Sequence, residues 1–295
     1  MAVVREKNRR FVVSADQGGI FISPRIWADL YLGSINKLCL DDHFVGTEMY
    51  PWIHPLLVER VMEEYSILGV GLEGMHLRTG GIHESYGWRN RAILAGLNQA
   101  MVNTPKALSL WGDKFNYMLI HSPEARNEDV KIAMRTTRNT FFYIENHKHT
   151  GAYGTSVAVA RDGVTSGLNV GVMFDLWHDF ESLNHHNDDA KKIQLLVSNL
   201  EWVLQQADQN NISGVGLHIP LGLSDCLPEQ NRTNILNSVG KLINEPQYSK
   251  YVRHIVLENQ PLPLDAISMP FWKVRKYARE NEEKLRLIKE SGLLG

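Results

Sequence analysis

The sequence contains only two cysteines, Cys39 and Cys226, among its 295 residues. Two thiols cannot build a disulfide framework or a cysteine-rich zinc site, so both classes are excluded. No stretch approaches the roughly 18 consecutive apolar residues that a membrane-spanning helix requires. The charged start, "MAVVREKNRR", is not followed by an apolar segment. We therefore expect no secretory signal and a reducing, cytoplasmic location.

An excess of charge of one sign is also lacking, because 31 Lys and Arg residues face 33 Asp and Glu residues. The net charge of −2 and the pI near 6.6 give no overall attraction toward nucleic acid or an anionic membrane. We expect a small-molecule substrate rather than a nucleic-acid partner, although a local basic groove is compatible with a neutral average. The oligomeric state stays open, a homo-oligomer included.

No glycine-rich phosphate-binding fingerprint follows an early strand, which disfavours a nucleotide-binding open sheet. What recurs is a short apolar run that ends in polar residues, followed by an amphipathic segment with the spacing of a helix. The clearest of these helices are expected at 127–134, 188–208 and 271–290. The runs cover 10–15, 36–43, 69–76, 116–122, 141–147, 170–176, 214–220 and 254–259.

Eight buried strands that alternate with helices predict a (β/α)8 TIM barrel, with an open doubly wound sheet as the competing architecture. Neither a linker nor a low-complexity tract interrupts the chain. We therefore predict a single domain over residues 1–295, with a core from about 10 to 290.

Side chains that can bind a metal stand at the ends of most of the apolar runs. Catalytic residues of such barrels lie at the carboxyl ends of the strands, so these side chains are expected to meet at one mouth. Several carboxylates there would repel one another unless a cation lay between them. A mixed set of carboxylates and imidazoles suits Mn²⁺, Mg²⁺ or Co²⁺, and histidine also accommodates Zn²⁺. The last polar residues of the runs are Asp41 or His43, His76, His121, Glu145, Asp175, His218 and Glu258.

Four short motifs follow one another on successive predicted strands: "IEN" at 144–146, "FDLWH" at 174–178, "LH" at 217–218 and "LEN" at 257–259. In this order the sequence resembles the xylose-isomerase-like TIM barrels, a superfamily that includes sugar epimerases, hydroxypyruvate isomerase, related dehydratases and endonuclease IV. The resemblance implies that His178 is turned toward the substrate. It also implies a divalent metal held by Glu145, Asp175, His218 and Glu258.

The isomerase and epimerase members of this superfamily imply one chemistry. The metal binds neighbouring oxygens of a ketose, a glutamate takes a proton from the carbon next to the carbonyl, and the enediolate is reprotonated. Glu145 and Glu258 are the expected base and acid, and a lyase that removes water through the same enolate is a near neighbour. We predict an isomerase or epimerase of a small sugar or hydroxy-carbonyl compound. The expected substrate contacts are His178, Asn146, Trp177 and His76.

The endonuclease IV members imply another chemistry, in which three zinc ions cleave a phosphodiester. His76 and His121 resemble the histidines of the first metal there, and would hold a second metal in this chain. The Asp-x-His that completes the third zinc site has no match in "LSDCLPEQNRTN" at 223–234. We therefore favour small-molecule chemistry over DNA. A barrel that binds a ligand without turnover is the non-enzyme alternative.

Overall fold

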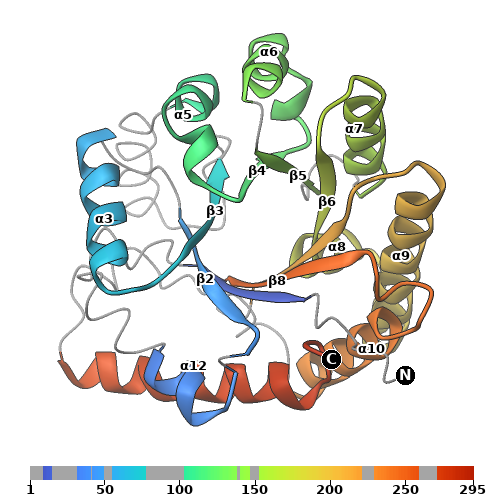
Figure 1. Cartoon of the computed structure of the whole chain (residues 1–295). Coiled ribbons are helices and arrows are strands. Elements are labelled where there is room, and N and C mark those ends of the chain that lie inside the picture. Colours follow the sequence, from blue (N-terminus) through green and yellow to red (C-terminus); the bar gives the residue numbers. More distant parts are fainter. Residues whose placement is uncertain are drawn as a thin grey trace, which may run out of the picture.

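Eight parallel strands close into a barrel, in which each strand pairs with the next along the chain and β1 pairs with β8 (Figure 1). The predicted TIM-barrel architecture is thereby confirmed. The computed structural model describes residues 9–14, 32–40, 42–49, 55–77, 103–137, 140–146, 153–220, 229–258 and 271–295. Side chains outside the description within these ranges are those of residues 55–57, 220, 229, 258, 271–278, 280 and 281. The strands are β1 (Arg10–Ser14), β2 (Phe44–Met49), β3 (Leu72–Leu77), β4 (Tyr117–His121), β5 (Phe141–Glu145), β6 (Val170–Asp175), β7 (Val215–Pro220) and β8 (Val252–Glu258).

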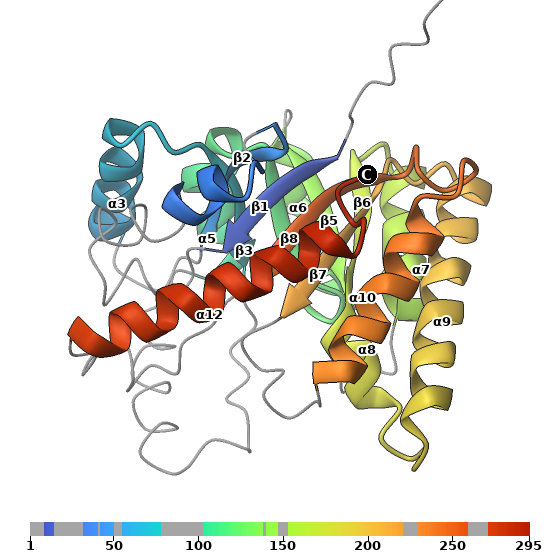
Figure 2. The ribbon, with the colours of Figure 1, turned by 90° about the horizontal axis from the view of Figure 1, so that it is seen from below.

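Helices surround the barrel, as the view along it shows (Figure 1), and α12 crosses the outside (Figure 2). Within the described part of the chain, no helix has the length and apolar character needed to cross a membrane. The α-helices are α3 (Pro55–Ile67), α5 (Thr104–Trp111), α6 (Glu128–Thr136), α7 (Tyr153–Thr165), α8 (Leu176–Ser182), α9 (Asp189–Gln209), α10 (Glu229–Ile243) and α12 (Phe271–Glu290). Two 3₁₀ helices, η1 (Gly112–Lys114) and η2 (Glu124–Arg126), flank β4.

Side-chain caps explain where several helices begin. Asn127 accepts a hydrogen bond from the backbone N–H of Asp129 and begins α6, and Asp188 accepts one from Ala190 and begins α9. Both caps stand where the sequence places a helix start, and the predicted helices at 127–134, 188–208 and 271–290 correspond to α6, α9 and α12. The buried stripe of α9 consists of Leu196, Leu200, Val203, Leu204 and Ala207.

Apolar side chains form two separate layers. The larger layer fills the space between the strands and the helices, whereas the smaller layer lies on the inward faces of the strands. Successive strand residues point to opposite faces, so a residue two positions beyond an inner-layer residue also points inward. The inner layer therefore lies directly beneath the polar side chains at the carboxyl ends. It consists of Val12, Tyr117, Leu119, Phe141, Tyr143, Met173 and Val256.

The second strand does not lie where the sequence predicts it. Residues 32–37 are helical, Cys39 takes a left-handed φ of 53°, and the strand begins only at Phe44. The apolar alternation of Leu38 and Leu40 comes from the end of that helix, where their N–H groups bond to the carbonyls of Ser34 and Ile35. His43 therefore precedes β2 at its amino end, and the prediction of a strand-end ligand there is wrong. Asp41 lies outside the described residues.

A polar cluster lies toward the amino ends of the strands. His254 contacts the hydroxyl of Tyr143 at 2.8 Å through Nδ1 and the carboxylate of Glu73 at 3.2 Å through Nε2. Glu73 also accepts hydrogen bonds from Arg10 and Asn116. Burial would raise the pKa of Glu73, but these partners lower it to about 2. His254 is thus a buried, hydrogen-bonded interior histidine.

Candidate metal centre

A ring of ionisable side chains occupies the carboxyl end of the barrel. The register pairs His121 with Glu145 across β4 and β5, and Asp175 with His218 across β6 and β7, so both pairs project inward. Burying so many charged groups is unfavourable unless they compensate one another or hold an ion. Every member of the ring is at most 5% exposed; the members are Glu48, His76, His121, Glu145, Asp175 and His218.

Glu145 stands at the centre of this ring. Its Oε1 lies 2.8 Å from Nδ1 of His218, and its Oε2 lies 3.1 Å from Nε2 of His76 and 3.0 Å from Nε2 of His121. Burial would raise the pKa of Glu145, but the three imidazoles hold it well below its usual value. For His76, burial alone would lower the pKa, but the carboxylates of Glu145 and Glu48 raise it to about 9. His121 differs, because burial outweighs its ion pair and lowers its pKa. Glu145 is thus an ionised carboxylate shared by three imidazoles.

Asp175 begins a helix and faces the ring at the same time. Its Oδ1 accepts hydrogen bonds from the backbone N–H groups of Trp177 at 2.7 Å and His178 at 2.8 Å, which makes it the N-cap of α8. Its Oδ2 lies 3.7 Å from Nδ1 of His218. The amide of Asn146 bonds to the backbone N–H and carbonyl of Asp175. One oxygen therefore orders the strand end while the other faces His218.

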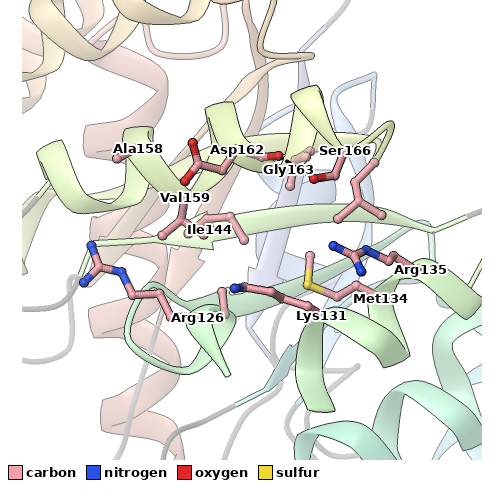
Figure 3. A pocket seen from close by; sticks show the side chains of 13 residues that line it. Arg126, Lys131, Met134, Arg135, Ile144, Ala158, Val159, Asp162, Gly163 and Ser166 are labelled. Atoms are coloured by element: carbon pink, nitrogen blue, oxygen red, sulfur yellow. Dashed lines mark hydrogen bonds between the residues drawn. The ribbon is translucent and has the colours of Figure 1, made fainter. Parts of the chain in front are cut away.

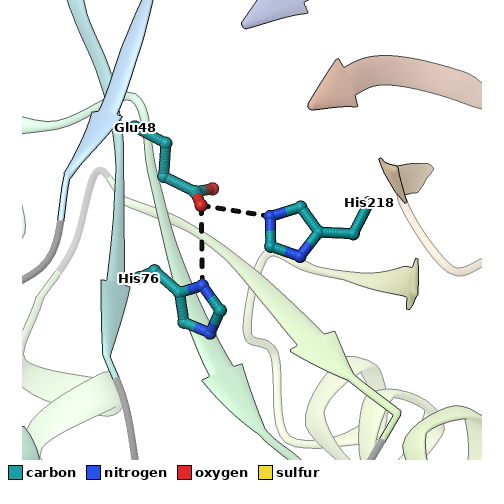
Figure 4. Close-up of side chains that lie close together, drawn as sticks. All are labelled: Glu48, His76 and His218. Carbon is teal, nitrogen blue, oxygen red and sulfur yellow. Dashed lines mark hydrogen bonds and ion pairs between the residues drawn. The ribbon is translucent and has the colours of Figure 1, made fainter. Parts of the chain in front are cut away.

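Glu48 is the member of the ring that the sequence analysis missed. It lies near the end of β2, and its Oε1 lies 3.2 Å from Nε2 of His218 and 3.5 Å from Nδ1 of His76 (Figure 4). Its Oε2 accepts a hydrogen bond of 2.7 Å from the hydroxyl of Tyr117. Burial would raise the pKa of Glu48, but His218 and His76 lower it to about 2. With β2 placed at 36–43, no signal pointed to this residue. The strand itself does not alternate simply, because Phe44 packs against the outer layer, Val45 packs against the inner layer, and the register shifts between Phe44 and Gly46.

The ring contains three overlapping groups that fit a divalent cation. In each group, one ligand atom per residue lies within 4.8 Å of the others. The Oε2 atom of Glu145 is buried and accepts no hydrogen bond of good geometry from the described residues, although two imidazole nitrogens lie close to it. Imidazole nitrogens and carboxylate oxygens together suit Zn²⁺, Co²⁺ or Mn²⁺. The groups are Glu145 with Asp175 and His218, Glu145 with His76 and His121, and Glu48 with His76 and His218.

The predicted ligands are thus largely brought together. Glu145, Asp175 and His218 form one group, and His76 and His121 meet Glu145 in a second group, as the prediction of a second metal requires. Glu258 ends β8, in register with Pro220 of β7, but its side chain lies outside the described part. Its role as a ligand stays a prediction.

The predicted substrate contacts lie at the edge of the ring. Nδ1 of His178 lies 3.0 Å from the carbonyl oxygen of Asn146 and 3.7 Å from Oδ2 of Asp175. The ring of Trp177 stacks on Phe180, with the centroids 6.1 Å apart, and packs against the outer apolar layer. His178, with a side chain 22% exposed, is more accessible than the histidines of the ring. Contact of these residues with a substrate stays a prediction.

A cavity of about 170 Å³ lies away from this ring, between α6 and α7 and over the outer face of β5 (Figure 3). Its lining includes Arg126, Lys131, Arg135 and Asp162 around apolar side chains such as Ile144. Ile144 points outward, whereas its neighbour Glu145 points into the barrel. The cavity is therefore on the far side of the strand from the candidate ligands, and we do not assign it to the substrate.

No family model matches this sequence, and no curated protein matches it. Several solved structures are similar. The apo form of 3-keto-D-glucoside 4-epimerase YcjR from E. coli has 13% identity and a TM-score of 0.46, over 90% of this chain and 98% of that chain. The IolI protein with a bound zinc atom has 9% identity and a TM-score of 0.44, over 96% and 99%. An amidohydrolase from Burkholderia multivorans with bound zinc has 8% identity and a TM-score of 0.42, over 97% of this chain and 96% of that chain.

Proposed function

We propose that this chain is a divalent-metal-dependent isomerase or epimerase. It acts on a small sugar or hydroxy-carbonyl compound by proton transfer through an enediolate. The observation that carries the proposal is the convergence of Glu145, Asp175 and His218 from three adjacent strands at the carboxyl end of the barrel. These residues, with Glu258 at the end of β8, would hold the cation. When bound, a divalent cation polarises a substrate carbonyl and makes the neighbouring C–H more acidic.

The side chains of the chain itself would divide the remaining work. The low pKa of Glu145 suits a metal ligand better than a proton acceptor. Glu258 is therefore our first candidate for the proton transfer, and Glu145 is the second. His178 lies in the first turn of α8, near Asp175, and would donate a hydrogen bond to a substrate oxygen or accept one from it. The buried inner layer beneath the ring would exclude water from that side.

Hydrolysis of a phosphodiester with two metals is the second candidate. The specific observation in its favour is the group of His76, His121 and Glu145, because a carboxylate shared by two groups is suited to hold two cations side by side. Against a third metal stands His178, which belongs to none of the three groups found among the described residues. We therefore place proton-transfer chemistry first.

The decisive experiment combines metal content with hydrogen exchange. The purified protein is loaded with Mn²⁺, Co²⁺ or Zn²⁺, and a panel of ketoses and hydroxy-carbonyl compounds is incubated in D₂O. We expect metal-dependent incorporation of deuterium at the carbon next to the carbonyl, observed by NMR. Glu145→Gln should lose tightly bound metal and exchange together, because this carboxylate belongs to two groups.

A surface carboxylate provides the matched control. Glu128 pairs with Lys131 on α6, and Glu128→Gln should keep metal content and exchange unchanged. A protein without divalent metal would end the proposal. Bound metal without exchange, combined with metal-dependent nicking of abasic-site DNA, would replace it with the second candidate.

A further inference from the structure

We infer that Glu48 is a positioning residue that sets how His76 and His218 face the cation. The inference rests on the proposed metal centre but not on the reaction. Neither the composition nor any motif in the sequence points to Glu48. Direct pairing of β2 with β3 brings Glu48 to His76, and closure of the barrel brings it to His218 of β7.

The geometry gives each histidine two different neighbours. His218 directs Nδ1 to Glu145 at 2.8 Å and Nε2 to Glu48 at 3.2 Å. His76 directs Nε2 to Glu145 at 3.1 Å and Nδ1 to Glu48 at 3.5 Å. The two rings thus present opposite nitrogens to Glu145, and a single oxygen of Glu48 faces the remaining nitrogen of both (Figure 4).

The chemistry of imidazole makes this arrangement consequential. A neutral imidazole binds a metal through one nitrogen and carries its proton on the other, and the hydrogen bond made by the second nitrogen selects the tautomer. A carboxylate behind a ligating histidine fixes the orientation of the ring and increases its basicity. Glu48 would therefore hold His76 ready to bind through Nε2 and His218 ready to bind through Nδ1.

Glu48 itself is held in place. Its side chain is fully buried, and its second oxygen accepts the hydrogen bond from Tyr117. The ring of Tyr117 occupies the space above Gly74, where an added Cβ would lie 2.2 Å from it. One oxygen is therefore engaged by a tyrosine and the other faces both imidazoles, which is the arrangement of an orienting group rather than of a carboxylate turned toward a cation.

Glu48 also belongs to one of the three candidate groups, so a direct role as a ligand is the competing interpretation. In that role, His76 and His218 would bind through the nitrogens that face away from Glu145. Their other nitrogens would then carry the protons and donate to Glu145, which would be a hydrogen-bond acceptor rather than a ligand although it belongs to two of the three groups. The positioning role instead lets Glu145 bind the cation, with Asp175 and His121 beside it.

The experiment compares Glu48→Gln with Glu73→Gln, its matched control. Glu73 is also a buried carboxylate that contacts a histidine, His254, but it lies at the opposite end of the barrel. The affinity for Co²⁺ is followed through the visible spectrum, and the folded state is checked by circular dichroism. Glu48→Gln should weaken Co²⁺ binding by about 10- to 100-fold and change the spectrum. Glu73→Gln should leave the Co²⁺ affinity and the visible spectrum unchanged.

A second measurement uses only the wild-type sequence and does not depend on whether the variant folds. Long-range ¹H–¹⁵N spectra of the histidines in the Zn²⁺-loaded protein should show Nδ1–H for His76 and Nε2–H for His218. The reverse tautomers would overturn the inference. So would an anomalous metal peak between Glu48, His76 and His218, or equal Co²⁺ affinity in Glu48→Gln and wild type. These results would leave the metal centre standing, whereas a wild-type protein that binds no divalent metal would remove both proposals.

Discussion

The carboxylate of Asp175 accepts a hydrogen bond from the backbone N–H of His178, and this contact begins α8 where β6 ends. The three-residue spacing in "DLWH" is the spacing between an N-cap and the N–H group that it satisfies. It also brings Nδ1 of His178 to 3.7 Å from the other oxygen of the same carboxylate. The capping of α8 therefore accounts for the three-residue spacing between Asp175 and His178. The remaining oxygen of Asp175 faces the candidate centre.

Substitutions at Asp175 should separate its two roles. Asp175→Asn keeps an oxygen that can cap α8 but loses the charge, so we expect at least about tenfold weaker metal binding with little change in the free energy of unfolding. Asp175→Ala should also lose about 1 kcal/mol of stability through the missing cap. Metal titration and urea unfolding of the metal-free proteins measure the two effects. Asp188→Ala, which removes the N-cap of α9 outside the ring, should lose stability alone.

Metal binding should release a proton from His76. Glu145 and Glu48 raise the pKa of His76 to about 9, and a protonated imidazole cannot bind a metal. The affinity of the group that contains His76 should therefore increase with pH, by about tenfold per unit between 6.5 and 9. Calorimetric titrations in buffers of different ionisation enthalpy count the protons released. His185→Ala, which removes an exposed histidine outside the ring, should keep the same slope. An affinity independent of pH in this range would contradict the prediction.

The polar cluster at the amino end should make the fold sensitive to acid. Glu73 has a folded-state pKa of about 2, below the ordinary value of 4.5, so its contribution is complete above pH 4.5 and is lost as pH falls toward 2. Glu73→Gln should cost about 2 kcal/mol at pH 7, since solvent screens its ion pair with the half-exposed Arg10. Urea unfolding at several pH values should show the two curves converging in acid. A constant difference from pH 7 to pH 3 would rule this out.

A glycine makes room for the tyrosine that holds Glu48. Gly74→Ala would place a Cβ 2.2 Å from the ring of Tyr117 and force the buried ring to move. We expect a loss of about 2–3 kcal/mol from overpacking, accompanied by weaker metal binding as the bond from Tyr117 to Glu48 breaks. Thermal unfolding and Co²⁺ titration measure the two effects. Gly154→Ala on α7 meets no atom within 4 Å and should be neutral or stabilise the helix by about 0.5–1 kcal/mol.

Most of the barrel is predictable because seven strands are continuous apolar runs buried on both faces. Their predicted positions agree with β1 and β3 to β8 within a few residues. The second strand was placed wrongly because Thr47 and Glu48 interrupt its apolar pattern, while Leu38 and Leu40 at the end of a helix show the alternation expected of a strand. Local pattern fails where a strand carries a functional charge inside the barrel.

The candidate ligands that end strands were equally accessible to sequence reasoning. His121, Glu145 and Asp175 are the last residues of β4, β5 and β6, so the order of the runs alone places them at one mouth. Which atoms face one another was not accessible. That Glu145 divides its two oxygens between separate imidazoles follows from the register of neighbouring strands and the closure of the sheet.

The sequence by itself determined the eight-fold alternation and the residue types at the strand ends, because periodicity and strand termination are local properties of the chain. Only the tertiary structure decided that Glu48 lies behind His76 and His218, residues 28 and 170 positions away. Contacts across such separations depend on barrel closure, which pairs β1 with β8 and brings side chains from distant strands to one buried centre.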